Sequence, residues 1–368
     1  MRQPAPWLIY ALGGGWGHLN RAIALGRIAA AHSPVHILTN SPYAAQVGEE
    51  LERWRQQGKP VPTLLIFPAT LEKAALCRQV QAYLLSTTCR CLIVDTFPRG
   101  LGGELADLLP RLSCPKVLIH RDLSWDYVRS HHLPDFVARH YDSIIIPGEG
   151  AVPLASLPLA HPTPPWLIYG TADLAEAFQS QVSSPDQGPE GCLSSNPFTG
   201  KRPLILVCAA GNAAEQAFFG TLTHQLQQAF PHTSLRCLSA SCPPGCPPAL
   251  WLQAWPGLPW VAQATVVVGG GGYNTVYECA ALKKPLIAFA WPRLYDCQAR
   301  RLSRYGTQVS TNSEAIAQVN ATLQSPQNLQ PPDPNPRPCT PYPNGATDAF
   351  RHIQRLTDVN PYKQKQQL

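Results

Sequence analysis

The strongest constraint on the fold is a run near the end of the chain, Val266 to Glu278, with the sequence VVVGGGGYNTVYE. Three β-branched apolar residues in a row are typical of a buried strand. Four glycines then let the backbone turn sharply and approach a ligand closely. A helix that begins directly after them aims its free N–H groups and positive dipole end at the turn, which favours phosphate binding. The run therefore predicts a strand–turn–helix unit that holds a phosphate-bearing ligand.

A second glycine turn lies near the start of the chain, from Leu12 to His18, with the sequence LGGGWGH. An apolar segment precedes it and a helical segment, Leu19–Ala31, follows it. Gly26 shares a face of that helix with Leu19 and Ile23, where a glycine lets the helix lie close on a sheet. Two such units in a chain of 368 residues predict two nucleotide-binding-type domains.

Apolar segments and helical segments alternate in both halves of the chain, which favours a parallel, doubly wound sheet in each. The strands predicted in the first half are Trp7–Leu12, Val35–Thr39, Leu64–Phe67, Cys91–Asp95, Lys116–His120, Ser143–Ile146 and a short last one, Trp166–Tyr169. Those predicted in the second half are Leu204–Cys208, Leu235–Leu238, Val266–Val268 and Leu286–Ala290. The other predicted helices are Leu71–Leu85, Ala213–Phe230, Tyr273–Leu282, Ala346–Leu356 and one that opens with Ala299–Leu302.

The domain boundaries follow from composition. We expect an N-terminal domain at 1–182, a linker rich in Ser, Pro, Gly and Asn at 183–202, and a C-terminal domain at 203–325. A proline-rich connection at 326–345 and a final helix with a disordered tail at 346–368 complete the chain. Ligands of open α/β sheets bind beyond the carboxyl ends of the strands, so we expect the site in a cleft between the two domains.

Composition excludes some classes of function. The net charge is +6 and the arginines are scattered, which suits an anionic small substrate or lipid surface better than nucleic acid. Twelve cysteines form no C-x-x-C pair, which is typical of reduced thiols in a cytoplasmic protein. The first apolar run resembles a signal peptide but is short and leads into a glycine turn, which favours a strand. No apolar run approaches the ~18 residues of a membrane span, and no DxD triplet indicates a metal.

His18 and Asp95 are the candidate catalytic residues. His18 stands at the start of the first helix, where a helix N-terminus favours a neutral imidazole that can accept a proton. It is a candidate general base, or else a helix-capping or packed histidine. Asp95 ends a predicted strand, where it would orient the histidine, or else form a turn before Pro98.

Other candidates bind a ligand. Glu278, expected in the first turn of its helix, is either the second half of a capping box with Thr275 or an acceptor for two ribose hydroxyls. Asp296 and Gln298 follow another predicted strand and would contact a sugar, with Asp296 as a plain N-cap as the alternative. The full set predicted to bind substrate is Gly15, Gly17, Arg21, Gly211, Asn212, Gly270, Gly271, Gly272, Tyr273, Asn274, Thr275, Glu278, Asp296 and Gln298.

These residues resemble a known family. The turn Gly-x-Gly-His-x-x-Arg (Gly15 to Arg21) is followed by Gly-Gly-Tyr-Asn-Thr-x-x-Glu (Gly271 to Glu278), a strand opened by Pro285, and Asp296-x-Gln298. The pattern is similar to GT-B glycosyltransferases of the MurG-like kind, with a family 28 C-terminal domain. It is most similar to predicted bacterial members with a GGYNT motif. Trp16 within the first turn and Lys283-Lys284 before the late proline depart from the family pattern.

The resemblance implies two Rossmann-like domains facing across a cleft. The C-terminal domain would bind a nucleotide-sugar, with a UDP-sugar expected, and the N-terminal domain would bind the acceptor. It also implies a final helix that crosses back to the first domain, an inverting reaction, and no essential metal or other cofactor. In this chain His18 would be the base, Glu278 the ribose ligand, and Asp296 and Gln298 the sugar contacts. The acceptor is open; a lipid or a glycan would fit a cytoplasmic enzyme with or without contact to the inner membrane face.

Three alternatives remain at this point. A Gly-His-x-x-Arg turn also resembles sugar-nucleotide hydrolases, in which the histidine would activate water. Sugar-nucleotide epimerases share the architecture, although no additional acid–base pair is evident for them. A nucleotide-sugar-binding protein without activity is the third.

Overall fold

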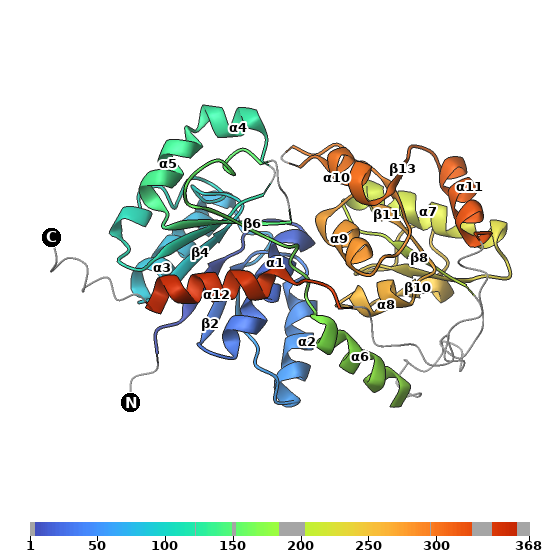
Figure 1. Ribbon diagram of the computed structural model, residues 1–368, viewed down its shortest axis with the longest axis horizontal. Coiled ribbons are helices and arrows are strands. Elements are labelled where there is room, and N and C mark those ends of the chain that lie inside the picture. Colours follow the sequence, from blue (N-terminus) through green and yellow to red (C-terminus); the bar gives the residue numbers. More distant parts are fainter. Residues whose placement is uncertain are drawn as a thin grey trace. The chain divides into compact units, whose positions relative to one another are not determined.

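The computed structural model describes residues 4–121, 123–148, 152–183, 203–294, 296–325 and 341–358. It divides into two compact units (Figure 1). We call the first the N-terminal unit, within Met1–Ile168, Leu294–Asp296 and Asn344–Leu368, and the second the C-terminal unit, within Tyr169–Arg293 and Cys297–Pro343. Most of the predicted linker (183–202) and of the proline-rich connection (326–345) lies outside the described residues, at 184–202 and 326–340. So do the tail (359–368), Cys192 and Cys339.

The N-terminal unit contains a seven-stranded parallel sheet in the order β3-β2-β1-β4-β5-β6-β7. Its strands are β1 Trp7–Tyr10, β2 Val35–Thr39, β3 Thr63–Ile66, β4 Cys91–Asp95, β5 Lys116–Ile119, β6 Ser143–Pro147 and β7 Ala160–Thr163. Its helices are α1 Trp16–Ala30, α2 Ala44–Gln56, α3 Lys73–Ser86, α4 Trp125–Ser130, α5 Leu133–His140 and α12 Gly345–Asp358. Since β1 lies between β2 and β4, the turn that follows β1 is flanked by the carboxyl ends of both neighbours.

Helices cover both faces of this sheet. Alternate strand residues such as Leu8 and Val94 pack against α3, α4 and α5. On the other face α1 lies close to β2, because a Cβ on Gly26 would already be 3.1 Å from Cδ1 of Ile37. The C-terminal helix α12 packs on α1, where the ring of Phe350 stacks on His32 at 4.8 Å. The last helix of the chain therefore contributes to the core of the N-terminal unit.

The C-terminal unit contains a six-stranded parallel sheet in the order β10-β9-β8-β11-β12-β13. Its strands are β8 Leu204–Cys208, β9 Ser234–Leu238, β10 Trp251–Leu252, β11 Val266–Gly270, β12 Leu286–Phe289 and β13 Thr307–Val309. Its helices are α6 Thr171–Ser183, α7 Ala213–Ala229, α8 Leu258–Gln263, α9 Tyr273–Ala281, α10 Gln298–Tyr305 and α11 Asn312–Leu323. Residues of α7 and α11 pack on one face, and residues of α8, α9 and α10 on the other, so this sheet is also doubly wound.

The predicted strands are present except Trp166–Tyr169, for which the prediction was wrong. The last strand of that sheet is instead β7, Ala160–Thr163. The backbone of Leu167 bonds to a side chain, because its N–H donates to Oδ1 of Asn344 at 3.2 Å and its carbonyl accepts from Nδ2 at 2.8 Å. An amide side chain thus takes the place of a neighbouring strand. No helix among the described residues has both the length and the apolar character to cross a membrane.

The start of α12 gives a test of how the C-terminal helix docks. A Cβ on Gly345 would lie 1.9 Å from the carbonyl oxygen of Pro164, whereas a Cβ on Gly48 in α2 would meet no atom within 4 Å. We expect Gly345→Ala to lower the free energy of unfolding by ~1–3 kcal/mol through overpacking. Gly48→Ala, the matched control, should raise it by ~0.5–1 kcal/mol through helix propensity. Denaturant titration measures both, and an unchanged midpoint for Gly345→Ala would contradict the close docking.

Candidate functional site

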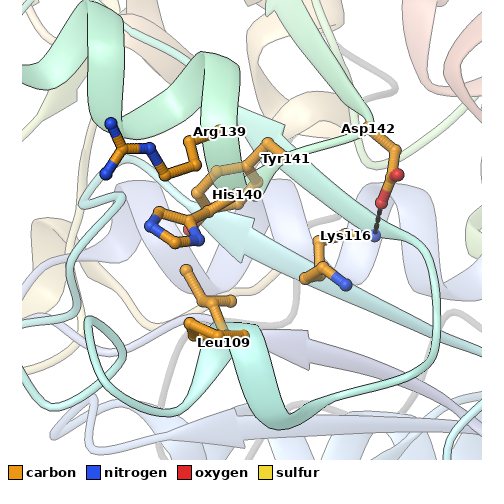
Figure 2. Close-up of a pocket in the computed structure, with 7 residues that line it drawn as sticks. Leu109, Lys116, Arg139, His140, Tyr141 and Asp142 are labelled. Atoms are coloured by element: carbon orange, nitrogen blue, oxygen red, sulfur yellow. Dashed lines mark hydrogen bonds between the residues drawn. The ribbon is translucent and has the colours of Figure 1, made fainter.

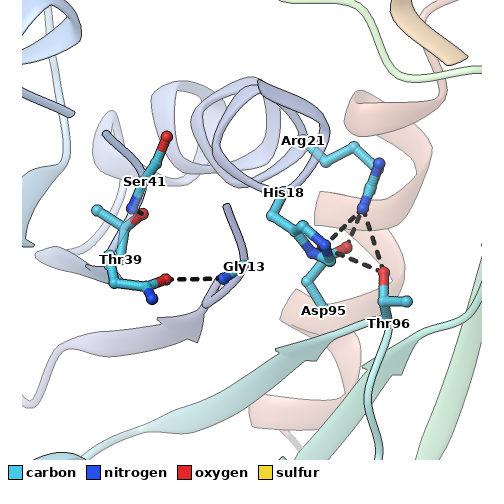
Figure 3. Close-up of polar contacts among 8 residues, drawn as sticks. Gly13, His18, Arg21, Thr39, Ser41, Asp95 and Thr96 are labelled. Atoms are coloured by element: carbon cyan, nitrogen blue, oxygen red, sulfur yellow. Dashed lines mark hydrogen bonds and ion pairs between the residues drawn. The ribbon is translucent and has the colours of Figure 1, made fainter. Parts of the chain in front are cut away.

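His18 and Asp95 lie together at the carboxyl edge of the N-terminal sheet (Figure 3). The helix α1 begins at Trp16, so His18 is in its first turn, and Asp95 is the last residue of β4. Because β4 pairs with β1, the two side chains meet, with Nδ1 of His18 2.5 Å from Oδ2 of Asp95. The structure therefore places Asp95 where the sequence suggested a histidine-orienting group.

Arg21 holds the same carboxylate from one turn further along α1. Its Nε donates to Oδ1 of Asp95 at 2.9 Å and its Nη2 donates to Oδ2 at 2.7 Å. The Arg21 side chain is buried, with 2% of the residue exposed. Its burial and its bidentate bond show that Arg21 fixes Asp95. A contact of Arg21 with substrate stays a prediction.

The electrostatics of Asp95 follow from these neighbours. Complete burial opposes ionisation, but the guanidinium of Arg21 and the imidazole of His18 outweigh it and hold the pKa of Asp95 well below its usual range. The carboxylate is thus ionised at neutral pH and accepts a hydrogen bond that Nδ1 of His18 donates. Nε2 is then the ring nitrogen that is left to accept a proton.

The backbone around His18 is closely fitted. Gly13 has a φ of +143°, and a Cβ there would lie 2.6 Å from Cδ2 of the His18 ring. Thr96 has a φ of +72°, which is rare for a residue other than glycine and is found where surrounding contacts enforce it. Its hydroxyl accepts from Nη2 of Arg21 at 3.2 Å and donates to Oδ2 of Asp95 at 3.3 Å. No sequence motif marks Thr96, so its contact with Arg21 and Asp95 could not be predicted.

The glycines of the first turn serve different purposes. A Cβ on Gly14 would meet nothing within 4 Å, and one on Gly15, the N-cap of α1, would meet only the Gly17 nitrogen at 3.9 Å. A Cβ on Gly17 would be 3.2 Å from Nη1 of Arg21. Gly14 and Gly15 therefore leave space for a ligand, whereas Gly17 leaves space for the arginine.

The glycine turn of the C-terminal unit shows the same division. The strand β11 continues through Gly270, and the N-cap of α9 is Gly272, which provides no side-chain cap. A Cβ on Gly271 would be 2.9 Å from Cδ1 of Leu302 in α10, whereas one on Gly272 would meet nothing within 4 Å. Gly272 and the uncapped first turn of α9 are thus the parts of this motif open to an anion.

Glu278 lies in the second turn of α9, so its expected place in the first turn and the capping-box alternative were both wrong. The N-cap is Gly272, and Thr275 is already the third helical residue. Burial raises the pKa of Glu278 to about 8. Among the described residues no hydrogen bond or ion pair to this carboxylate is present, so nothing within that part of the chain compensates its charge.

The neighbours of Glu278 in the motif are differently exposed. Tyr273 is buried and its ring packs against Tyr277 at 4.6 Å, which makes it a core residue. Asn274 and Thr275 are half-buried. The buried Arg301 of α10 donates from Nη1 to the carbonyl of Gly271 at 2.9 Å, a contact that holds the turn and that no sequence pattern indicated.

The turn after β8 is tied to the loop after β12. Asn212 is the N-cap of α7, and its Oδ1 accepts from the Glu215 amide at 3.0 Å. Gly211 has a φ of +132°, and a Cβ there would lie 1.9 Å from Oε2 of Glu215. Glu215 forms a bidentate pair with Arg293, with both N–O distances 2.6 Å. Gly211 and Asn212 thus shape a strand-end turn that Glu215, not recognised from the sequence, locks in place.

Asp296 and Gln298 differ from what the sequence suggested. Cys297, not Asp296, is the N-cap of α10, so the N-cap alternative for Asp296 was wrong. The Asp296 carboxylate is 3.5 Å from Nη2 of Arg121, within the N-terminal unit. Gln298 is buried and its Oε1 accepts from the Trp291 amide at 2.9 Å, so it anchors the loop after β12.

A pocket of ≈ 370 Å³ lies elsewhere on the N-terminal unit (Figure 2). It contains Lys116, the first residue of β5, whose amide donates to Oδ2 of Asp142 at 2.7 Å. It therefore lies at the amino edge of the sheet, opposite the edge that carries His18 and Asp95. None of the predicted site residues lines it. Within the described ranges no group of three or more His, Cys, Asp or Glu side chains is arranged to hold a metal.

No protein-family model and no curated protein matches the sequence. Solved structures do match it over almost its whole length. They include UDP-GlcNAc 2-epimerase from Neisseria meningitidis bound to UDP-GlcNAc (TM-score 0.62, 12% identity, 96% of this chain and 100% of that one). They also include the calicheamicin glycosyltransferase CalG4 (TM-score 0.56, 14% identity, 98% and 100%). A third is LpCGTa in complex with UDP (TM-score 0.53, 16% identity, 99% and 97%). The chain therefore has the GT-B fold, with two Rossmann-like domains.

The raised pKa of Glu278 predicts a pH dependence of stability. The unfolded carboxyl loses its proton near its ordinary value of 4.5, whereas the folded one keeps it to about 8. The folded state binds more protons in this window, so the free energy of unfolding should fall as pH rises from 4.5 to 8.

Glu278→Gln should remove this contribution and melt a few degrees above the wild type at pH 8.5, on a scale of ~2–4 °C per kcal/mol. Thermal melts of both proteins across pH 4.5–8.5 measure the difference, with Glu314→Gln as an exposed-carboxylate control. If the melting temperatures of wild type and Glu278→Gln changed equally with pH, this would contradict the raised pKa of Glu278.

Proposed function

We propose that this chain is a glycosyltransferase that moves a hexosyl group from a nucleotide-diphosphate sugar to an acceptor hydroxyl. The observation that carries the proposal is the His18–Asp95–Arg21 arrangement. A buried carboxylate, fixed by an arginine, holds Nδ1 of a histidine whose other nitrogen is left to accept a proton. This is the arrangement that a general base requires.

In the proposed reaction the acceptor oxygen attacks the anomeric carbon of the donor sugar. Its proton passes to Nε2 of His18, the bond between the anomeric carbon and the diphosphate oxygen breaks, and the nucleoside diphosphate leaves. Asp95 stabilises the imidazolium as the proton arrives. A single displacement of this kind inverts the anomeric centre.

The donor is assigned to the carboxyl edge of the C-terminal sheet. The uncapped amides of α9 and its dipole favour a diphosphate, and the space at Gly272 admits it. Glu278, which has no protein partner among the described residues, is assigned to the ribose hydroxyls. Asp296 is assigned to the sugar. Backbone amides and the dipole would stabilise the leaving diphosphate, so the scheme includes no metal ion.

The nature of the neighbours supports a nucleotide-sugar donor. One of the matched structures is bound to UDP-GlcNAc and another to UDP, so a UDP-sugar is the first donor to test. The two motifs that resemble MurG-like enzymes, at Gly15–Arg21 and Gly271–Glu278, support that branch of the glycosyltransferases. The acceptor is proposed to be a small molecule, lipid or glycan rather than nucleic acid, in a cytoplasmic setting.

A sugar-nucleotide hydrolase is the second candidate, because Nε2 of His18 would serve equally as a base toward water. In that reaction free sugar and nucleoside diphosphate appear without any acceptor. Product analysis by mass spectrometry, with and without candidate acceptors, separates hydrolysis from transfer. Binding of nucleotide-sugar with no product in either condition would indicate the inactive protein.

The role of His18 is tested by His18→Gln. We expect the turnover number to fall by ~10²–10⁴-fold, because a general base contributes about that much. Donor affinity, measured by isothermal titration calorimetry, should change less than twofold, because the imidazole acts on the acceptor. His224→Gln, an exposed histidine of α7, is the control. A collapse of donor affinity in His18→Gln would make the residue structural and would remove the base from the scheme.

The role of Glu278 is tested by Glu278→Ala. Loss of two hydrogen bonds to the Glu278 carboxyl group costs ~1–3 kcal/mol, so the dissociation constants of the nucleotide-sugar and the free nucleotide should both rise by about 5- to 100-fold. Glu314→Ala, an exposed glutamate of α11, should leave both unchanged. Unaltered nucleotide affinity in Glu278→Ala would exclude the ribose contact.

A further inference from the structure

Two aromatic rings stand beside the first glycine turn. Trp16 is the first residue of α1 and Tyr43 is the N-cap of α2. Their rings are stacked almost parallel, with centroids 4.1 Å apart and an interplanar angle of 5°. Both residues are only half-buried, so each keeps part of its surface accessible. The stack therefore joins the turns that follow β1 and β2 and presents an apolar surface there.

The same turns are rigidly linked to the proposed base. Oδ1 of Asn40, which follows β2, accepts from the Gly13 amide at 2.8 Å, and a Cβ on Gly13 would lie 2.6 Å from Cδ2 of the His18 ring. Figure 3 shows Gly13 between Thr39 and Ser41 on one side and His18 and Asp95 on the other. A molecule that touches the aromatic pair is thus held by the same turn that carries the histidine.

The backbone between the aromatic pair and His18 carries no side chains at Gly14 and Gly15. Trp16 contacts Tyr43 on the side of β2, and His18 contacts Asp95 on the side of β4, with β1 between the two strands. Gly14 and Gly15 lie in the turn that follows β1, and neither glycine has a side chain to fill the space above it. The two glycines thus lie between the Trp16–Tyr43 pair, toward β2, and the imidazole of His18, toward β4.

We propose that the Trp16–Tyr43 pair is a platform that binds the flat face of a ring in the acceptor. The chemical class is a ring-bearing alcohol, such as a glycoside or an aromatic alcohol, rather than an alkyl-chain alcohol. Rigid aromatic side chains offer large contact areas at low conformational cost, and flat apolar faces pack well on them. This inference rests on the proposed function, because it identifies the occupant of the turn as the acceptor.

The test measures binding of three probes in the absence of donor: phenyl β-D-glucopyranoside, methyl β-D-glucopyranoside and 1-hexanol. Saturation-transfer NMR titrations give the dissociation constants. Trp16→Ala and Tyr43→Ala should weaken both glycosides by about three- to tenfold, as the loss of an aromatic contact does. Trp16→Phe, which keeps an aromatic ring, should restore most of the affinity. Tyr305→Ala, an exposed aromatic residue of the C-terminal unit, should have no effect.

The two glycosides show which kind of ring binds to the aromatic pair. Binding of the phenyl glycoside alone indicates that an aromatic ring binds, and binding of both glycosides indicates that the sugar ring binds. Hexanol that binds as tightly as the glycosides, or Trp16→Ala with unaltered glycoside affinity and an unaltered melting temperature, would overturn the platform. Failure of the proposed function looks different. In that case the wild type transfers no sugar from any donor, while the glycosides still bind and still depend on Trp16.

Discussion

The N-terminal site depends on one buried ion pair, between Asp95 and Arg21. A fully buried carboxylate is costly unless a cation and hydrogen bonds compensate it, and here a bidentate guanidinium does so. Removal of either partner would leave a buried charge without compensation. The pair therefore binds the end of β4 to α1 and leaves Oδ2 in place for Nδ1 of His18. The orientation and tautomer of the histidine follow from this arrangement.

Each unit places a carboxylate beside a glycine turn, but the two carboxylates behave differently. Asp95 has cationic partners and stays ionised, whereas Glu278 has no partner among the described residues and holds its proton to about pH 8. The difference comes from the neighbours, because both groups are desolvated. A carboxylate with cationic partners stays ionised and can orient a histidine. An uncompensated one is suited to accept hydrogen bonds from a ligand, which would supply what the protein does not.

The sequence predicted the buried strands, because parallel strands such as Val266–Val268 are continuous β-branched runs. It did not predict the less buried strands β7, β10 and β13. It failed at Trp166–Tyr169, where an asparagine 177 positions away pairs with the backbone of Leu167. The contact between His18 and Asp95 was predictable, since it follows from strand order. The pairs Glu215–Arg293 and Arg301–Gly271 were not, because they join residues distant in sequence with no spacing rule. The position of Glu278 in α9 was predicted wrongly because the spacing of Thr275 and Glu278 suggested a capping box, whereas the N-cap is Gly272.

The glycines show why a motif assigns too many residues to a ligand. Gly271 and Gly17 lie close to neighbouring side chains, Leu302 and Arg21. Gly13 and Gly211 have a positive φ, and His18 and Glu215 approach them closely. Among the glycines of the two turns, only Gly14, Gly15 and Gly272 have open space above the backbone. The glycines of these turns therefore have two different roles. Most of them allow neighbouring side chains to pack closely on the backbone, and a few leave the backbone beside them open.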